Sequence, residues 1–242
     1  MTNAPKQTVK VFIDFDGTIT TEDVGEKFFV TFADKEKAYA IVNEWLDGKI
    51  TSRQTWERLC ALIENLDMKK FDEFINGISL DPYFIEFVEF LEARGIEPIV
   101  LSDGLDYYIE RILKKYGLER LKVYSNKAIF ENGRCRPEFP YTDEECDLCA
   151  NCKRNHIIAN SADDDITFYI GDGFSDACPV QYCDFVFAKR TLLKYCEKHR
   201  ITFFPYSDFG DVRKRMEELF SRRRLKKRHR AFLKRREVYL KG

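Results

Sequence analysis

The sequence has no apolar run long enough to cross a bilayer as a helix. Such a helix needs about 18 consecutive, mostly apolar residues, and none of the apolar stretches in the 242 residues reaches this length. The chain begins M-T-N-A-P-K-Q-T and has there no apolar core of the kind found in secretory signals. The sequence therefore predicts a cytoplasmic protein without a membrane-spanning segment.

A disulfide framework is also unexpected, because disulfides are rare in proteins that are not exported. Four of the eight cysteines nevertheless lie close together in the sequence, at Cys135, Cys146, Cys149 and Cys152. Two overlapping C-x-x-C spacings in an intracellular chain are compatible with a structural zinc site. One tight turn would then have to present three of the thiolates, and four reduced thiols without a metal are the alternative.

The pattern of apolar residues predicts an α/β fold with an inserted lobe. Apolar residues make up 44% of the chain and aromatic residues 14%, which is enough for a large core. Runs typical of strands at 9–13, 96–101 and 166–170 alternate with helical patterns, as in a Rossmann-like, doubly wound parallel sheet. Residues 21–77 contain only helical patterns and form the candidate lobe.

The net charge of −1 hides an uneven distribution. From Arg213 onward there are 14 Lys and Arg but only 3 Asp and Glu, so this basic tail carries about +11 and the rest of the chain about −12. The tail can pack back on the acidic body or on a second subunit of a homodimer. It can instead contact nucleic acid or an anionic membrane. We favour the first interpretation and expect no nucleic-acid partner, because no aromatic stacking pattern accompanies the charge.

One motif near the start of the chain, V-K-V-F-I-D-F-D-G-T-I-T at residues 9–20, carries the strongest functional signal. Its first five residues predict a buried strand that ends directly in Asp14 and Asp16. Ligands of open α/β sheets collect at the carboxyl ends of the strands, and unpaired buried carboxylates are costly. The motif therefore indicates a site, whereas Asp-x-Asp by itself is equally compatible with a polar strand exit.

Polar residues follow two other predicted strands in the same way. Ser102 and Asp103 come after the second strand, and Asp172 and Asp176 come after the third. Right-handed crossovers place the carboxyl ends of parallel strands at one edge of the sheet. Carboxylates gathered there need a counter-charge, and Mg²⁺ prefers all-oxygen ligands. Such a cluster beside anion-holding donors is typical of phosphoryl transfer, in which an Asp can be the nucleophile.

Together these motifs resemble those of the haloacid dehalogenase (HAD) phosphatase superfamily. The matching residues are D-F-D-G-T at 14–18, Ser102, Lys153 and G-D-G-F-S-D at 171–176, in the order of the family. The resemblance covers nearly all of the chain up to about Val212. It implies a phosphoric monoester hydrolase of the phosphoserine-phosphatase-like branch, subfamily IB.

The resemblance also implies a division of the chain into three parts. Residues 1–20 and 81–212 would form the HAD core, and residues 21–80 would form a small helical cap. Such a cap closes over the substrate and excludes water. Residues 213–242 would form the basic tail, which is expected to be at least partly helical.

Four residues take catalytic roles if the resemblance holds. Asp14 would attack phosphorus, and Asp16 would protonate the leaving oxygen and later activate water. Ser102 would donate a hydrogen bond to the phosphoryl oxygens. Lys153 would neutralise Asp14 and the phosphate, with Arg154 as the neighbour to test if this assignment fails.

The resemblance implies a Mg²⁺ site made from the acidic motifs. Asp14 and Asp172 would ligate the ion directly, and Asp16 would contribute its backbone carbonyl. Asp176 would support the metal or a bound water. A zinc ion at the cysteines, in contrast, would be structural and would sit just before Lys153.

The residues that choose the substrate are expected to lie mainly in the cap. Asp23 matches the place of a substrate-reading acidic residue in phosphoserine phosphatases, although a solvent-facing helix position explains it equally well. Arg53 and Arg58 lie near the place of the cap arginine that binds the substrate carboxylate there. Asp103 and Gly104 border the expected site, with Asp103 more a capping or surface acid than a catalyst.

The sequence departs from phosphoserine phosphatases at two positions. Gly17 stands where those enzymes usually have Ser, and Glu57 aligns nearest to their cap arginine. The segment G-D-G-F-S-D-A-C-P, followed by D-F-V-F-A-K, is closer to a neighbouring branch. That branch holds the methionine-salvage enolphosphate phosphatases and the phosphoethanolamine/phosphocholine phosphatases, whose members also tend to have cysteines just before the motif lysine.

Three functions are compatible with these features. The first is a Mg²⁺-dependent phosphomonoesterase that acts on a small phosphorylated metabolite. The second is a phosphotransferase that passes the phosphoryl group to an alcohol other than water. The third is a non-catalytic protein whose basic tail binds nucleic acid or a membrane. The intact Asp16 argues against the third. The sequence does not discriminate between the first two, and we take the first as the expected function.

Overall fold

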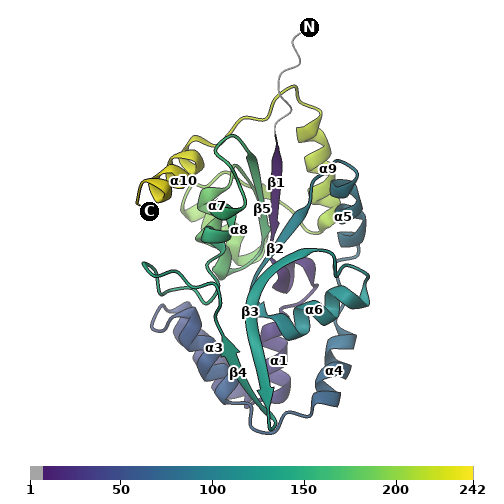
Figure 1. Cartoon of the computed structure of the whole chain (residues 1–242), viewed down its shortest axis with the longest axis vertical. Helices are drawn as coiled ribbons and strands as arrows, with labels where there is room; N and C mark the ends of the chain where they lie inside the picture. The colour runs from purple at the N-terminus through teal and green to yellow at the C-terminus, as the bar shows by residue number, and fades with distance from the viewer. Residues whose placement is uncertain (1–7, 242) are drawn as a thin grey trace. The chain divides into compact units, whose positions relative to one another are not determined.

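The computed structural model describes residues 8–241 and contains a seven-stranded sheet in the order β4-β3-β2-β1-β5-β6-β7 (Figure 1). The strands are β1 (Val9–Ile13), β2 (Pro98–Leu105), β3 (Lys122–Glu131), β4 (Arg134–Glu138), β5 (Ile166–Gly171), β6 (Phe185–Ala188) and β7 (Phe204–Pro205). β1 pairs in parallel with β2 and β5, and β6 with β5 and β7, whereas β3 and β4 are antiparallel. The predicted α/β fold with a mostly parallel sheet is confirmed.

Ten α-helices connect and flank these strands in the described residues. They are α1 (Val24–Phe32), α2 (Lys35–Leu46), α3 (Ser52–Ala61), α4 (Met68–Gly77), α5 (Phe84–Glu92), α6 (Asp106–Lys115), α7 (Lys153–Ala159), α8 (Arg190–Lys198), α9 (Phe209–Phe220) and α10 (His229–Lys241). Within residues 8–241, no helix combines the length and the apolar character that crossing a membrane requires.

The chain divides into two compact units. The first contains the chain up to Asp14, residues 81–100 and the chain from Lys153 onward, and the second contains residues 15–80 and 101–152. The second unit thus holds α1 to α4 together with α6, β3 and β4. The division into core, cap and tail that the family resemblance implies stays a prediction.

In the first unit, β1 and β5 form the centre of a buried core. The side chains of Val11, Phe12 and Ile13 are fully buried, as expected for a parallel strand with helices on both faces. The register pairs Ile13 with Ile170. The sheet order reverses between β1 and β5, and such a switch point is where open α/β sheets bind ligands.

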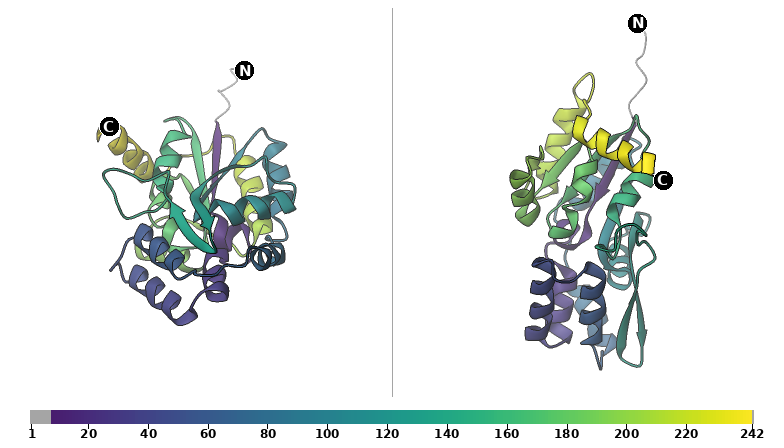
Figure 2. Two further views of the ribbon diagram at one scale, coloured as in Figure 1. Left: turned by 60° about the horizontal axis from the view of Figure 1, so that its bottom comes forward. Right: turned by 90° about the vertical axis from the view of Figure 1, so that its left-hand side faces the viewer.

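In the second unit, aromatic residues form the core under the helices. The rings of Phe28 and Phe71 stack with their centroids 4.4 Å apart, and Tyr107 stacks on Phe71 at 5.2 Å. β3 and β4 form a hairpin (Figure 2) that turns at Asn132 and Gly133, both with positive φ. This conformation is that of a type I′ turn, which Asn-Gly favours.

The basic tail packs on the acidic body of the first unit. Arg235 of α10 is 1% exposed, and its guanidinium lies 3.3 Å from Asp184. The same guanidinium donates hydrogen bonds to Thr167 Oγ1 and to the carbonyl of Tyr182. The first turns of the basic segment belong to α9, in which Met216 is fully buried. Both helices therefore contribute to the packing of this unit.

We expect Arg235→Met to lower the free energy of unfolding by about 3–5 kcal/mol, because Asp184 then stays buried without its partner. Arg236 is the matched control, since it lies next to Arg235 in α10 but is exposed. Arg236→Met should change the stability by no more than about 0.5 kcal/mol. Chemical denaturation of both variants measures the difference. Equal midpoints for the two variants would show that the buried ion pair does not stabilise the fold.

Candidate active site

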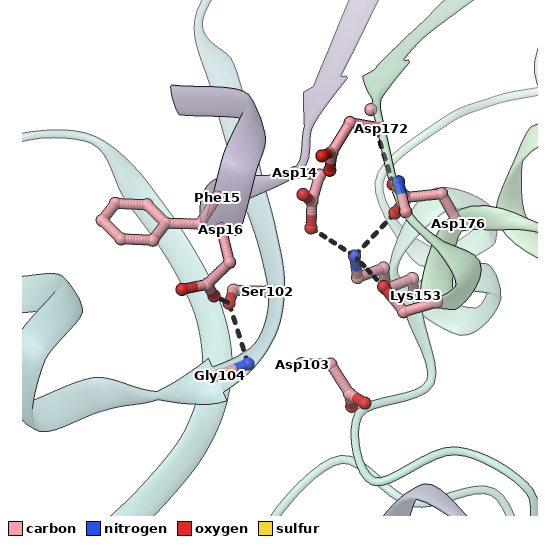
Figure 3. A network of polar contacts seen from close by, with 12 residues as sticks. Asp14, Phe15, Asp16, Ser102, Asp103, Gly104, Lys153, Asp172 and Asp176 are labelled. Carbon is pink, nitrogen blue, oxygen red and sulfur yellow. Dashed lines mark hydrogen bonds and ion pairs between the residues drawn. The ribbon is translucent and has the colours of Figure 1, made fainter. Parts of the chain in front are cut away.

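Three carboxylates meet at the carboxyl ends of β1 and β5 in the first unit (Figure 3). Asp14 follows β1, Asp172 follows β5, and Asp176 ends the short 3₁₀ turn after it. All three are buried, and one oxygen of each lies within 4.8 Å of the others. Among residues 8–241, this is the group in which three or more Asp, Glu, His or Cys ligand atoms lie close enough to share a metal ion.

Arg190, which is exposed, lies 3.1 Å from Asp172 Oδ2, and Lys153 is the buried cation of this cluster. Lys153 is the first residue of α7, and its side chain is 2% exposed. The Nζ atom lies 2.5 Å from Asp14 Oδ1 and 2.7 Å from Asp176 Oδ1, and it donates to Ser175 Oγ at 3.2 Å. One ammonium group therefore contacts two buried carboxylates, and its expected role at the phosphate stays a prediction.

Asp176 is held by four hydrogen-bond donors. Besides the lysine, Tyr169 donates its hydroxyl at 2.6 Å, and the backbone N–H groups of Asp172 and Gly173 donate at 3.1 Å. A Cβ atom on Gly171 would lie only 2.4 Å from Asp176 Oδ2, so this position needs a glycine. These contacts hold the Asp176 side chain in place, and its predicted support of a metal or a bound water stays a prediction.

The three carboxylates of this cluster contact two cations, Lys153 and Arg190. Burial, then the charges of Asp176 and Asp172, raise the pKa of Asp14, and Lys153 offsets only part of this effect. Burial alone would lower the pKa of Lys153, but the charges of Asp14 and Asp176 outweigh it and raise the pKa. The donor set is all oxygen and its charge is incompletely balanced, so these residues suit a hard divalent cation such as Mg²⁺.

We expect the affinity for Mg²⁺ to increase with pH, because protons compete for Asp14 below its raised pKa. The stability of the metal-free protein changes with pH in the opposite direction. Because the pKa of Asp14 is higher in the folded than in the unfolded protein, protonation of Asp14 favours the folded state. This stabilisation is complete below the unfolded-state pKa and is lost as pH rises through the folded-state pKa. Mg²⁺ titrations by calorimetry between about pH 5 and 8 test this. An affinity that does not change over this range would contradict it.

A second group of predicted residues comes together in the second unit (Figure 3). The Asp16 carboxylate accepts hydrogen bonds from Ser102 Oγ at 3.1 Å, from the Tyr108 hydroxyl at 3.1 Å and from the N–H of Val24 at 3.2 Å. The N–H of Gly104 donates to Ser102 Oγ at 2.9 Å. Asp16 and Ser102, both predicted to be catalytic, are therefore in direct contact.

The local backbone explains two features around Asp16. Gly17 has φ +73°, a conformation that glycine adopts without strain. β2 extends to Leu105, so Ser102 and Asp103 lie within the end of the strand and not after it. The predicted strand was too short because polar residues at a buried strand end resemble a loop in sequence.

Tyr108 keeps its proton at neutral pH. Its side chain is fully buried. Burial and the charges of Asp16 and Asp23 all raise the pKa of the phenol. The hydroxyl is therefore a permanent donor to Asp16, which was not foreseen from the sequence.

Both carboxylate oxygens of Asp103 accept hydrogen bonds from other residues of the protein. Ser52, at the start of α3, donates its hydroxyl to Asp103 Oδ2, and the N–H of Asn151 donates to Asp103 Oδ1 at 2.9 Å. The Asn151 side chain donates to the carbonyls of Ser102 and Tyr124. These bonds fix the strand end that carries Ser102. The only signal for Asn151 in the sequence is its place two residues before the motif lysine.

The residues expected to bind the substrate have contacts with other residues of the protein. Asp23 caps α1 by accepting the N–H of Glu26 at 2.8 Å. Arg58 pairs with Glu44 at 2.6 Å in an exposed ion pair. The Arg53 guanidinium lies 5.8 Å from the centre of the Phe139 ring. A substrate-binding role for these side chains, and for Asp103 and Gly104, stays a prediction.

The four clustered cysteines do not form a metal-binding group in the described residues. Cys135 Sγ lies 3.4 Å from Sγ of Cys60. Cys152 is buried, and its N–H donates to the carbonyl of Tyr141, whereas Cys146 and Cys149 are half-buried. Zinc binding by these cysteines therefore stays a prediction.

Comparison with known proteins places the chain among phosphatases. The family model described as Putative Phosphatase matches residues 9–202, which is most of the sequence. The chain belongs to this family. Together with the fold, this confirms the HAD resemblance, and the protein is a HAD-type phosphoric monoester hydrolase.

Two curated relatives are similar over almost their whole length. The 2-hydroxy-3-keto-5-methylthiopentenyl-1-phosphate phosphatases of Bacillus cereus and Bacillus mycoides are each 29% identical to this phosphatase over 215 residues. The alignments cover 88% of this chain and 97% of each relative. The part of the chain outside residues 9–202, which includes α9 and α10, lies beyond the family match.

Solved structures of phosphoserine phosphatases share the fold. A phospho-aspartyl intermediate analogue of phosphoserine phosphatase has a TM-score of 0.67 at 22% identity, covering 88% of this chain and 99% of that one. The phosphoserine phosphatase from T. onnurineus has a TM-score of 0.65 at 17% identity, covering 90% and 98%. At these identities the likeness concerns the fold.

Proposed function

We propose that this phosphatase hydrolyses the phosphate monoester of a small metabolite through an aspartyl-phosphate on Asp14. The observation that carries the proposal is the buried cluster of Asp14, Asp172 and Asp176 with Lys153 at 2.5 Å from Asp14. A nucleophilic carboxylate needs a neighbouring cation to approach a phosphate dianion, and the lysine provides one.

The reaction proceeds in two displacements. A carboxylate oxygen of Asp14 attacks phosphorus, the P–O bond to the leaving group breaks, and Asp16 gives its proton to the leaving oxygen. Asp16 then takes a proton from water as the water oxygen attacks phosphorus, which breaks the bond to Asp14 and releases phosphate. Asp14 and Asp16 are two residues apart, so their Cα atoms are no more than about 7 Å apart. The proposed reaction requires both side chains to face one phosphoryl group.

The remaining residues bind the phosphoryl group and a cation. Ser102 donates to the phosphoryl oxygens, and Lys153 neutralises charge on the phosphate. Asp14 and Asp172, with the backbone carbonyl of Asp16, would hold Mg²⁺, and the ion would supply positive charge to the phosphoryl oxygens.

A screen of phosphorylated metabolites with Mg²⁺ tests this function. The first candidate is 2-hydroxy-3-keto-5-methylthiopentenyl-1-phosphate, because it is named for the Bacillus relatives. Phosphoserine and phosphoethanolamine are the alternatives from related branches. Release of inorganic phosphate from one of them supports the proposal, and no release from any phosphate monoester contradicts it. Addition of small alcohols distinguishes hydrolysis from phosphotransfer, since a phosphotransferase makes a new ester.

Three further proposals accompany this function. Structural zinc at the clustered cysteines is tested by metal analysis of protein purified without chelators, and absence of zinc excludes it. A homodimer is tested by measuring the mass in solution. A cytoplasmic location without a nucleic-acid partner is proposed for an enzyme of small metabolites.

A further inference from the structure

Tyr108 contacts Asp16, the proposed acid/base, and has no role yet in the proposed reaction. It lies on α6, and its side chain is fully buried. The hydroxyl is 3.1 Å from both carboxylate oxygens of Asp16. A phenol hydroxyl can donate to an oxygen of the Asp16 carboxylate and, in the protonated acid, to the carbonyl oxygen.

The protein makes room for this contact at Gly104. A Cβ atom at position 104 would lie 1.9 Å from the Tyr108 hydroxyl and 2.7 Å from Asp16 Oδ2. No real side chain tolerates such distances, so the glycine is required for Tyr108 and Asp16 to meet. Gly25, on α1, is also adjacent, since a Cβ there would lie 3.6 Å from the Tyr108 hydroxyl.

Three donors on three different elements hold the Asp16 carboxylate. They are Val24 N–H at the start of α1, Ser102 Oγ in β2 and the Tyr108 hydroxyl on α6. Ser102 has a predicted role on the phosphate, and the Val24 N–H is part of the backbone. Tyr108 is thus the side chain in this group that has no role in the proposed reaction except through Asp16.

We propose that Tyr108 is a positioning residue that fixes the orientation of Asp16 for proton transfer. The inference rests on the proposed function, because it concerns the acid/base step of that reaction. Since the hydroxyl contacts both oxygens, its loss leaves the carboxylate held by the Val24 N–H and Ser102 Oγ, and its orientation is less firmly fixed. Proton transfer depends on the orientation of the carboxyl group, so loss of the Tyr108 hydroxyl slows the steps in which Asp16 gives or takes a proton.

Two substrates with different leaving groups distinguish a role in proton transfer from a purely structural role. Phenyl phosphate releases phenolate, a poor leaving group that needs the proton of Asp16. 2,4-Dinitrophenyl phosphate releases an acidic phenol that leaves without a proton. Phosphorylation of Asp14 should therefore need Tyr108 with the first substrate but not with the second, whereas a general disturbance of the site slows both.

The test is the pre-steady-state burst of phenol release by wild type, Tyr108→Phe and Tyr107→Phe. Tyr107 is the matched control, because its hydroxyl donates to another carboxylate, that of Asp72, at 3.0 Å. With phenyl phosphate, Tyr108→Phe should slow the burst by about 10- to 100-fold, a part of what acid/base catalysis supplies. With 2,4-dinitrophenyl phosphate, its burst should equal that of wild type. Tyr107→Phe should match wild type with both substrates.

Gly104→Ala gives a second route to the same result. The added methyl group would overlap the Tyr108 hydroxyl and crowd Asp16 Oδ2, so it disrupts their contact while both side chains remain present. It should therefore slow the burst with phenyl phosphate more than with 2,4-dinitrophenyl phosphate.

Two results would overturn the inference. One is an unchanged burst of Tyr108→Phe with phenyl phosphate, and the other is an equal slowing with both substrates. Failure of the wild type to release phosphate from any phosphate monoester is a different outcome. It overturns the proposed function, and the inference with it.

Discussion

Asp14→Asn should lower the rate of p-nitrophenyl phosphate hydrolysis with Mg²⁺ by at least about 10⁴-fold, as expected for loss of a nucleophile. The amide has the same shape but does not attack phosphorus. Stability should not fall, because the substitution removes one negative charge from a buried cluster in which the charges of Asp176 and Asp172 raise the pKa of Asp14. Steady-state kinetics and a denaturation curve measure both effects.

Asp164→Asn is the control for this variant. It makes the same change of charge at an exposed position and should leave the rate unchanged. Full activity of Asp14→Asn would remove Asp14 from the mechanism. A loss of activity accompanied by unfolding would show that the variant does not test it.

Lys153→Met should lower the same rate by about 10²- to 10³-fold, because a preorganised positive charge at the phosphate is lost. The metal-free protein should also lose about 3–5 kcal/mol of stability, since Asp14 and Asp176 stay buried without their shared partner. Activity assays and denaturation without Mg²⁺ measure the two effects.

Arg154→Met is the matched control for Lys153→Met. Arg154 is the next residue of α7, is only half-buried, and donates to Asn155 at 3.1 Å. Its removal should change neither the rate nor the stability by a comparable amount. If Arg154→Met inactivates the enzyme and Lys153→Met does not, the motif lysine has been assigned to the wrong residue.

The sequence predicted the acidic cluster because strand patterns and chemistry coincide there. Val9–Ile13 is a buried strand in both the prediction and the structure, and Asp14 follows it directly. Asp172 stands at the same place after β5, which pairs with β1. Parallel pairing of two strands that each end in Asp brings these carboxylates together whatever the details of the loops.

The contacts of Asp16 could not be predicted in the same way. Tyr107 and Tyr108 are adjacent and look equivalent in the sequence, and only the register of α6 decides which one meets Asp16. Asn151 and Ser52 act through hydrogen bonds between residues far apart in the chain. No local pattern marks such partners.

The basic tail shows a different limit of prediction from the sequence. Its positive charge indicated a contact with the acidic body, and charge alone suggested a boundary near residue 213. The buried pair of Arg235 with Asp184 specifies that contact, yet nothing distinguishes Arg235 from the other basic residues in sequence. α9 runs across residue 213, because its apolar face belongs to the core of the first unit.

The most direct test of the mechanism is to trap the phosphoryl group on Asp14. Asp16→Asn lacks the base for the second step, so p-nitrophenyl phosphate with Mg²⁺ should phosphorylate the enzyme and leave it phosphorylated. Borohydride reduces an aspartyl-phosphate to an alcohol, and peptide mass spectrometry then identifies the modified residue. We expect the modification at Asp14 and none in the Asp14→Asn, Asp16→Asn double variant. Modification at another residue, or release of p-nitrophenol without any modified peptide, would contradict the aspartyl-phosphate mechanism.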